Sequence, residues 1–279
     1  MKFFRHRGAS AREAENTLIS LSRALAESDG AEFDVQRTSD NVLVVLHDDT
    51  LARTAVAWDS NHNLSESEYF EVVNTPVNLL SWATVRSIRV GKPHAPFTLN
   101  TPAQALEEAA ESMTEHEQES KIIACSCMKN SEEEDGHLLM TLPEALTLLV
   151  EQHPSKTYLV EVKGGDLEAA PLVARDIAAS GATPQQARLI GFDLLTMCAV
   201  KQHLPLYHCS HIVHQDEDED SLATESMVHA AADAGMDSVD FRACPITVTF
   251  EELIICAKRR LLVFVRLLVD KHSYRFYFF

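Results

Sequence analysis

Six ionisable residues lie at the carboxyl ends of short β-rich segments: His6, Glu32, Asp34, His47, Glu161 and Lys163. Glu32 and Asp34 are two positions apart, so a strand would place both carboxylates on one face. A strand buried on both sides is almost wholly apolar, and carboxylates in it require a partner such as a metal ion. Three carboxylates and water would suit Mg²⁺ or Ca²⁺, and the histidines suit acid-base chemistry.

The alternative is that these residues are ordinary strand-end charges exposed to solvent, as most charged side chains are. That explanation is adequate for any one of them alone. Four separate segments, however, each end in a residue suited to proton transfer or metal binding, and this coincidence favours a shared site. In a barrel of parallel strands, all of these ends would meet at one mouth.

The rest of the sequence indicates how such strands could be arranged. Short β-rich segments alternate with helical patterns, which is typical of parallel strands joined by crossover helices. The first helix is expected over residues 18–28, with Asn16 or Thr17 as its cap. About eight strands are expected, over residues 3–6, 31–36, 42–48, 157–165, 187–193, 204–213, 234–241 and 259–270. The prediction is an α/β protein with a (β/α)8 TIM-barrel fold.

Residues from about 55 to 140 interrupt this alternation. The segment is polar, contains four prolines and ends near the acidic run SEEEDG at 131–136. A chain of 279 residues suits one α/β barrel. We therefore expect a single domain over residues 1–279 with an insertion at about 55–140.

Composition limits the partners and the setting. The formal net charge of −18 repels nucleic acid and anionic membrane surfaces, so neither is expected as a partner. An anionic substrate would be compatible with this charge only if a bound metal reversed it locally. No apolar run is long enough to span a bilayer, no secretory signal follows the N-terminus, and most of the six cysteines lie in apolar segments. These features predict a cytoplasmic protein without a disulfide framework.

Three local patterns have structural explanations. The run YHCSHIVH at 207–214 contains residue types that could bind zinc, but His208 and His211 would lie on opposite faces of a strand. A strand of mixed core and rim residues is favoured, and Cys125 and Cys127 are expected to be packing residues. The aromatic residues 276–279 are expected to seal the bottom of the barrel or to contact another subunit, which would make the protein a homo-oligomer.

Five motifs, in order along the chain, resemble those of the glycerophosphodiester phosphodiesterase family, whose fold is a phosphatidylinositol-phosphodiesterase-like TIM barrel. They are His6-Arg7-Gly8, Glu15-Asn16-Thr17, Glu32-Phe33-Asp34-Val35-Gln36, His47-Asp48 with Arg53-Thr54, and Glu161-Val162-Lys163. The match is dense over residues 3–54, recurs over about 139–165 and then fades to a strand pattern.

The resemblance implies a role for each matching residue. His6 and His47 would be the general acid and base, and Glu32, Asp34 and Glu161 would hold a divalent metal, Mg²⁺ or Ca²⁺. Arg7 and Lys163 would contact phosphate oxygens, although Arg7 could instead pair with a carboxylate. Glu15 would orient the glycerol end of the substrate or the loop after the first strand. The implied activity is metal-dependent hydrolysis of a small glycerophosphodiester to glycerol 3-phosphate and an alcohol.

The C-terminal region departs from the family pattern. Members continue from the strand near residues 262–269 into a helix and a final strand with an Asp-Gly pair, whereas this sequence ends in YRFYFF. We therefore expect a truncated or altered end, which puts closure of the barrel in question. Two rival functions remain: lysophospholipase-D-like action on a larger lipid, with an apolar groove at Leu79, Leu80 and Trp82, or an inactive barrel that binds a phosphorylated ligand or a partner.

Overall fold

The structure is a computed structural model that describes residues 2–60, 62–92, 136–214, 221–243, 259, 262–270 and 273–278. Cys125 and Cys127 lie outside the described residues, as do nearly all of the acidic run at 131–136 and most of the charged loop expected at 214–221. The expectations for these segments therefore stay predictions.

Eight strands form the wall of the barrel: β1 (Lys2–Arg5), β2 (Gly30–Arg37), β6 (Thr157–Val162), β7 (Ala187–Gly191), β8 (Cys209–His214), β9 (Ser238–Ala243), β10 (Leu262–Asp270) and β11 (Ser273–Phe278). The strands from β1 to β10 pair in parallel in this order. The strand β11 pairs antiparallel with both β10 and β1, which joins the two edges. The predicted (β/α)8-type fold is confirmed.

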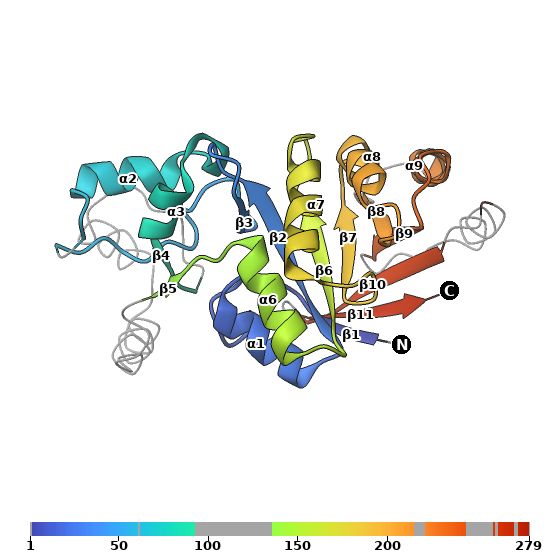
Figure 1. The fold of residues 1–279 in the computed structure, drawn as a ribbon, viewed down its shortest axis with the longest axis horizontal. Coiled ribbons are helices and arrows are strands. Elements are labelled where there is room, and N and C mark those ends of the chain that lie inside the picture. The colour runs from blue at the N-terminus through green and yellow to red at the C-terminus, as the bar shows by residue number, and fades with distance from the viewer. Residues whose placement is uncertain are drawn as a thin grey trace, which may run out of the picture.

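Helices cover the outside of this sheet (Figure 1): α1 (Leu18–Glu27), α6 (Leu142–Gln152), α7 (Ala169–Ser180), α8 (Leu194–His203) and α9 (Ser221–Asp233). The side chain of Thr17 accepts a hydrogen bond from the backbone N–H of Ser20 and begins α1, so the predicted first helix and its cap are confirmed. A reciprocal capping box between Thr141 and Glu144 begins α6. No helix in the described parts of the chain is long and apolar enough to cross a membrane.

Alternation along the strands separates two environments. On β2, Phe33 and Val35 are fully or nearly fully buried in the large core between the sheet and the helices. Inside the barrel, a smaller apolar cluster consists of Phe4, Leu159, Ile190 and Ile212. Since strand side chains alternate, Glu161 points to the same side as Leu159, into the barrel. The interior is therefore apolar at mid-height, with carboxylates above it.

Gly30 allows β1, β2 and β6 to meet closely. A Cβ atom at this position would lie 2.0 Å from the carbonyl oxygen of Thr157 and 2.6 Å from the ring of Phe4. Only glycine fits here. Because glycine has no side chain, the strand that carries Glu32 and Asp34 lies directly against β1, which His6 follows.

The third predicted strand is adjacent to the second, as expected, but it is not part of the barrel wall, in which it was counted. Among the strands that the structure describes, β3 (Leu43–Val45) pairs with β2 alone, antiparallel, and Val44 also forms an isolated bridge with Thr141. The reason is that β1 pairs with only two residues at the start of β2, which leaves the upper part of that edge open. A tight turn, with Asn41 at φ 64°, returns the chain along this open edge.

The eighth wall strand is instead β11, in the aromatic tail expected to seal the bottom of the barrel or contact a subunit. The sequence ended in a segment unlike the family pattern, yet its backbone pairs with β10 and with β1. A β-hairpin thus takes the place of a crossover helix and a parallel strand at the point of closure.

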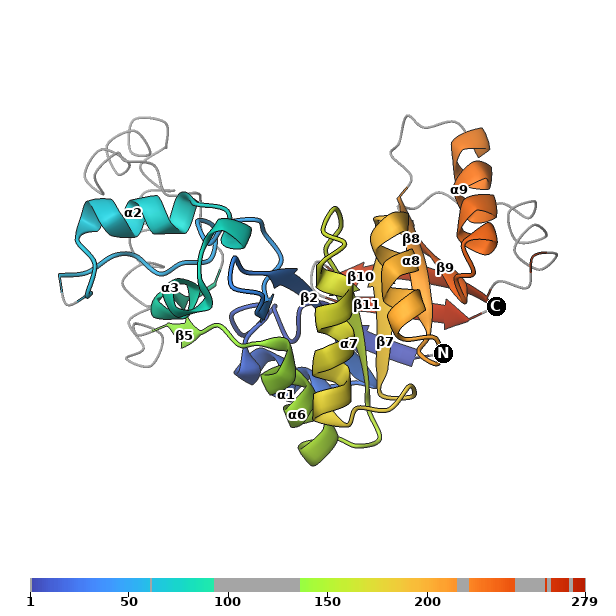
Figure 2. The same cartoon turned by 45° about the horizontal axis from the view of Figure 1, so that its top comes forward.

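The segment after β3 lies to one side of the barrel in both overall views (Figures 1 and 2). It contains α2 (Glu66–Asn74), η1 (Val77–Leu79), α3 (Trp82–Ser87) and a small sheet of β4 (Arg89–Val90) with β5 (His137–Leu138). These elements share a separate apolar core that includes Tyr69, Val73 and Ile88. Leu80 and Trp82 also pack against that core.

Candidate functional site

The loop after β1 folds back on itself to present His6 and Arg7. Gly8 has a φ of +81°, and a Cβ atom there would lie 2.3 Å from the hydroxyl of Ser20, so this position requires glycine. The backbone N–H of Asn16 donates to the carbonyl oxygen of Arg7 at 3.0 Å, which closes the loop. Arg7 and Asn16 both have positive φ, an uncommon conformation that the surrounding contacts must maintain.

Three carboxylates converge at the mouth of the barrel. The register of β2 against β6 pairs Asp34 directly with Glu161, and Glu32 lies two positions earlier on the same face of β2. One oxygen from each of these three side chains lies within 4.8 Å of the others, and all three residues are buried. Within the described residues this is the only group of its kind. The three predicted metal ligands are therefore brought together.

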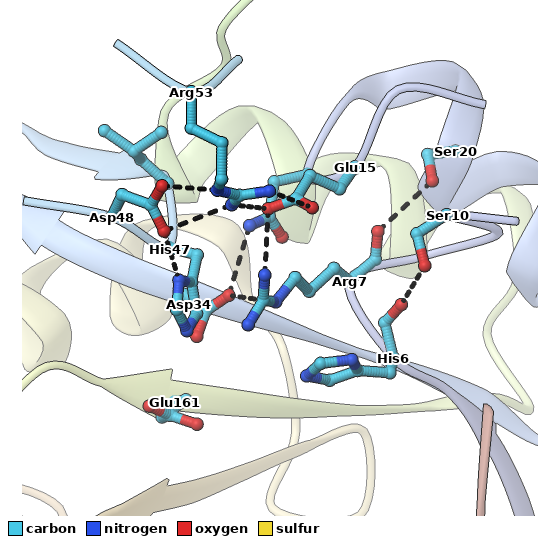
Figure 3. Close-up of polar contacts among 12 residues, drawn as sticks. His6, Arg7, Ser10, Glu15, Ser20, Asp34, His47, Asp48, Arg53 and Glu161 are labelled. Carbon is cyan, nitrogen blue, oxygen red and sulfur yellow. Dashed lines mark hydrogen bonds and ion pairs between the residues drawn. The ribbon is translucent and has the colours of Figure 1, made fainter. Parts of the chain in front are cut away.

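Two cations from the site lie against these carboxylates. The ammonium nitrogen of Lys163 is 2.7 Å from Oδ1 of Asp34 and 2.6 Å from Oε1 of Glu161. The guanidinium of Arg7 lies 3.7 Å from Oδ2 of Asp34 (Figure 3). Burial alone would raise the pKa of Asp34, but Lys163, His47 and Arg7 hold that pKa well below its ordinary value. Asp34 is therefore ionised and able to act as a ligand.

His6 faces the same cluster from the end of β1. Its Nε2 lies 3.7 Å from Oε2 of Glu32, and its side chain is 14% exposed. The backbone N–H of Arg7 donates to the same carboxylate oxygen at 3.0 Å. The backbone N–H of Gly8 donates to the main-chain oxygen of Glu32 at 3.2 Å. The loop that bears His6 is thus anchored to the strand that bears the carboxylates.

His47 is held by the loop that follows β3. Its Nδ1 is hydrogen-bonded to Oδ1 of Asp48 at 2.6 Å, which leaves Nε2 as the nitrogen available for chemistry. The amide nitrogen of Gln36 donates to the backbone oxygens of Leu46, His47 and Asp48 at 3.2, 2.9 and 2.7 Å. The loop is therefore fixed from inside the barrel by a residue of β2.

An ion-pair network joins the two loops. Arg53 donates to both oxygens of Glu15, at 2.6 and 3.0 Å, and to both oxygens of Asp48. Glu15 in turn accepts from Arg7 at 3.1 Å (Figure 3). Burial raises the pKa of Asp48, but hydrogen bonds from His47 and Arg53 outweigh this and lower it. Continuous contacts therefore run from Arg7 to His47.

The charges of the site fit a divalent cation. Five carboxylates take part, namely Glu15, Glu32, Asp34, Asp48 and Glu161, and three cations oppose them, namely Arg7, Arg53 and Lys163. Burial of an excess of two negative charges is unfavourable unless a counter-ion is present. A donor set made only of oxygens is the set that Mg²⁺ and Ca²⁺ prefer.

Four residues, Asn16, Gln36, Asp48 and Arg53, contribute to this geometry through contacts that the sequence did not indicate. Asn16 donates to Oδ2 of Asp34 at 3.1 Å, although its neighbour Thr17 supplies the helix cap. Gln36 fixes the loop of His47, and the pair Asp48 and Arg53 joins that loop to Glu15. All four lie inside motifs that resemble the family, so the signal was present, but only the fold shows what each side chain contacts.

The histidine-rich segment at 207–214 forms no metal site within the described residues. His208 is hydrogen-bonded through Nε2 to the hydroxyl of Ser238 at 2.8 Å, and that hydroxyl also contacts Ser210. His211 is a buried residue next to Ile212 in β8. The prediction of a strand with mixed core and rim residues is confirmed.

The fold and site together define a TIM-barrel protein with an acidic, metal-compatible centre at the carboxyl ends of its strands. The model of the glycerophosphoryl diester phosphodiesterase family matches residues 6–242, which include every site residue described above. The chain therefore belongs to this family, and the resemblance found in the sequence is confirmed.

Individual relatives agree with this membership. The chain is 48% identical over 54 residues to a glycerophosphodiester phosphodiesterase of Bacillus altitudinis, which is 19% of this chain and 22% of that protein. It is 33% identical over 104 residues to the uncharacterized protein YqiK of Bacillus subtilis, or 32% and 43% of the two chains. It thus spans less than half the length of these curated relatives.

A solved structure supports the fold over a longer stretch. The glycerophosphodiester phosphodiesterase of Agrobacterium tumefaciens superposes with a TM-score of 0.60 at 17% identity, covering 97% of this chain and 88% of that one. At this level of identity, the likeness concerns the fold.

Proposed function

We propose that this protein hydrolyses glycerophosphodiesters to glycerol 3-phosphate and an alcohol, with a bound Mg²⁺ or Ca²⁺. The convergence of three buried carboxylates with His6, His47 and two cations at one barrel mouth is the observation that carries this proposal. The names of the relatives support it. Glu32, Asp34 and Glu161 would hold the ion, which when bound supplies Lewis-acid stabilisation of charge on phosphoryl oxygens.

Each remaining residue has a proposed role in the reaction. His6 and His47 act as the general acid and base, one taking the proton of the attacking hydroxyl and the other donating to the leaving alkoxide. Arg7 and Lys163 contact the phosphate oxygens, on which negative charge increases in the transition state. Glu15 orients Arg7 from one side while it binds Arg53 from the other, which supports a positioning role in the loop after β1.

The two rival functions have less support. Leu79 is 68% exposed, but Leu80 and Trp82 pack against the core of the neighbouring segment, so the three do not form the apolar groove that a lysophospholipid would need. An inactive ligand-binding barrel would not require both histidines and all three carboxylates to converge. We therefore favour a small diester as the substrate.

We also propose a single domain over residues 1–279, with an insertion at about 55–140 that has its own apolar core. A cytoplasmic setting is supported by the free thiols of Cys198 and Cys209. The acidic net charge supports the absence of a nucleic-acid partner, and homo-oligomer formation remains a prediction from the aromatic tail.

Release of glycerol 3-phosphate from a panel of glycerophosphodiesters tests the proposal. Turnover should stop with a chelator, return with Mg²⁺ or Ca²⁺, and fall by about a hundredfold or more in His6→Ala and in His47→Ala. The matched control is His203→Ala, which removes an exposed histidine at the end of α8. Full turnover in the chelated protein, or in the double variant of His6 and His47, would reject the site.

A further inference from the structure

Lys163 lies against two of the three carboxylates that are proposed to hold the divalent ion. It directly follows β6, two positions after Glu161, so both side chains point to the same side of the sheet. Its backbone N–H donates to the carbonyl oxygen of Val35 at 3.1 Å, which fixes this position beside β2. Its ammonium nitrogen lies 2.7 Å from Oδ1 of Asp34 and 2.6 Å from Oε1 of Glu161. The ammonium group therefore bridges ligands from two neighbouring strands.

The two oxygens of Asp34 have different neighbours among the residues that the structure describes. Oδ2 accepts a hydrogen bond from the side-chain amide of Asn16 at 3.1 Å and lies 3.7 Å from the guanidinium of Arg7. Oδ1 is the oxygen that Lys163 contacts. Because the side chain of Asp34 is fully buried and is held from both sides, Oδ1 is the oxygen that it can offer to an ion. A divalent ion and the ammonium group of Lys163 must then share it.

The ammonium group opposes a divalent ion by its charge and its position. Carboxylate oxygens bind Mg²⁺ at about 2.0–2.1 Å and Ca²⁺ at about 2.3–2.6 Å. An ion on Oδ1 of Asp34 would therefore lie within about 5 Å of the ammonium nitrogen of Lys163. A double and a single positive charge at this separation repel each other strongly, even with the screening typical of sites near a protein surface. Binding of the ion therefore requires the ammonium group to move.

The side chain of Lys163 has room for this movement. It is 22% exposed, and its stem is long and flexible. It also lines a cavity of ≈ 310 Å³ beyond the carboxyl ends of β2 and β6. Asp49 and Asp166 line the same cavity, so an ammonium group that turned into it would keep carboxylates nearby. Lys163 can thus leave Asp34 and Glu161 without becoming an isolated buried charge.

We propose that Lys163 sets the affinity of this site for the divalent ion. Its ammonium group occupies the oxygens of Asp34 and Glu161 when no ion is bound, and it yields them when an ion binds, which frees it to contact the phosphate of the substrate. The inference rests on the proposed metal-dependent hydrolysis and deepens it. Lys163 therefore weakens metal binding, by about ten- to a hundredfold, which is less than fixed charges would give because the side chain turns away.

Calorimetric titration with Mg²⁺ or Ca²⁺ tests this in the full-length chain, freed of metal by a chelator. Lys163→Met should tighten the Kd of the ion by about ten- to a hundredfold, whereas Lys163→Arg, which keeps the charge, should not tighten it. The matched control Lys201→Met removes an ammonium group 2.7 Å from Asp237, at the amino end of β9, and should leave the Kd unchanged. An equal or weaker Kd in Lys163→Met would show that Lys163 organises the ligands instead, and would overturn the proposal.

A second variant and a second measurement serve if Lys163→Met is too unstable to titrate. Lys163→Gln also removes the charge but keeps a hydrogen-bond donor, and added Mg²⁺ should raise its Tm more than it raises the Tm of the wild type. An equal or smaller rise would overturn the proposal.

Hydrolysis measured on the same samples separates this inference from the proposed reaction. A tighter Kd in Lys163→Met, with no hydrolysis by the wild type, would support the inference and reject the reaction. Hydrolysis by the wild type, with equal Kd values in both proteins, would do the reverse. Absence of metal binding in both proteins would overturn the inference.

Discussion

Two of the polar clusters that the described residues form inside the barrel are stabilised in different ways. The mouth cluster, formed by Glu32, Asp34, Glu161 and Lys163, is ionised and carries excess negative charge. The amino-end cluster, formed by His208, Ser210 and Ser238, joins neutral groups by hydrogen bonds. Burial and the charge of Arg188 lower the pKa of His208 to about 4, so this imidazole is uncharged near neutral pH.

The difference indicates which cluster is functional. Neutral groups that satisfy one another's hydrogen bonds require no bound ligand. A buried excess of charge, in contrast, is stable only with a counter-ion. A histidine next to a serine is not by itself a catalytic pair, because Ser238 is fully buried. Unbalanced charge distinguishes the site better than the residue types do.

The largest effect is expected from Glu161→Gln, which keeps the size of the side chain but removes one of the three clustered carboxylates. The affinity for Mg²⁺ or Ca²⁺ and the value of kcat/KM should each fall by about a hundredfold or more, since the ligand set is incomplete. Calorimetric titration with the metal and an activity assay measure these two quantities. The charge-matched control is Glu151→Gln, on the outer helix α6. Unchanged metal affinity in Glu161→Gln would show that Glu161 is not a ligand.

Next in size is Asp48→Asn, which removes the charge between His47 and Arg53 but keeps a hydrogen-bond acceptor. We expect kcat to fall about ten- to a hundredfold with a smaller change in KM, because the orientation of His47 is affected more than substrate contact. Steady-state kinetics separate the two constants. A change confined to KM would instead assign Asp48 to substrate binding.

A smaller effect concerns the pH dependence of stability. The folded-state pKa of His208 is about 4 against an ordinary value of 6.5, so the unfolded chain binds more protons between these values. The free energy of unfolding should fall by about 1–2 kcal/mol as the pH drops through this window, and His208→Gln should reduce that fall, with the remainder due to His211, whose pKa burial also lowers. Urea denaturation at pH 7 and pH 5 measures it.

The mouth cluster and the neighbouring ion pairs of Asp48 should respond in a different pH window. The pKa values of Asp34 and Asp48 are lowered in the folded state, so their contribution to stability is present above the ordinary range and is lost as the pH falls below about 4. The same denaturation series, extended below pH 4 in the His208→Gln variant, would show this second loss with the contribution of His208 removed. If the wild-type free energy of unfolding fell in only one pH range, the two clusters would not titrate independently.

The smallest effect is expected for Ser238→Ala. The hydroxyl of Ser238 is buried between His208 and Ser210, so its removal should lower the free energy of unfolding by about 1–2 kcal/mol. Activity should be unchanged, because this cluster lies away from the mouth. Urea denaturation and an activity assay are the measurements, and a large loss of kcat in a folded variant would show that the two clusters are coupled.

The sequence was sufficient to predict the fold class. It was also sufficient to predict that the main site residues lie close together, because strand ends in a parallel sheet meet at one mouth. Glu32, Asp34 and Glu161 are such cases: their spacing and their place in apolar segments were sufficient. Residues 42–48 were correctly predicted to be a strand but were counted in the barrel wall, and no strand was predicted over residues 273–278; both differences have one reason. Local composition predicts that a segment is extended, but only pairing determines which neighbour it joins and in which direction.

The contacts that side chains make across the barrel mouth could not be predicted from the sequence, for a similar reason. Gln36 and Arg53 are separated from their partners by loops whose conformations depend on tertiary packing. Asn16 is a suitable helix cap by type, yet its positive φ turns it toward Asp34 instead. Residue type indicates what a side chain can do, and the backbone conformation determines which of these it does.

Closure of the barrel by β11 has a consequence for the order of folding. The strands β2 and β6 share six paired positions, whereas β1 contacts β2 at two, and its four pairs with β11 join residues 2–5 to residues 273–276. Pairings between distant parts of a chain form slowly. During refolding we therefore expect the carboxylates of β2 and β6 to assemble before β11 joins β1 and closes the barrel, so metal binding should recover before the last strand pairs.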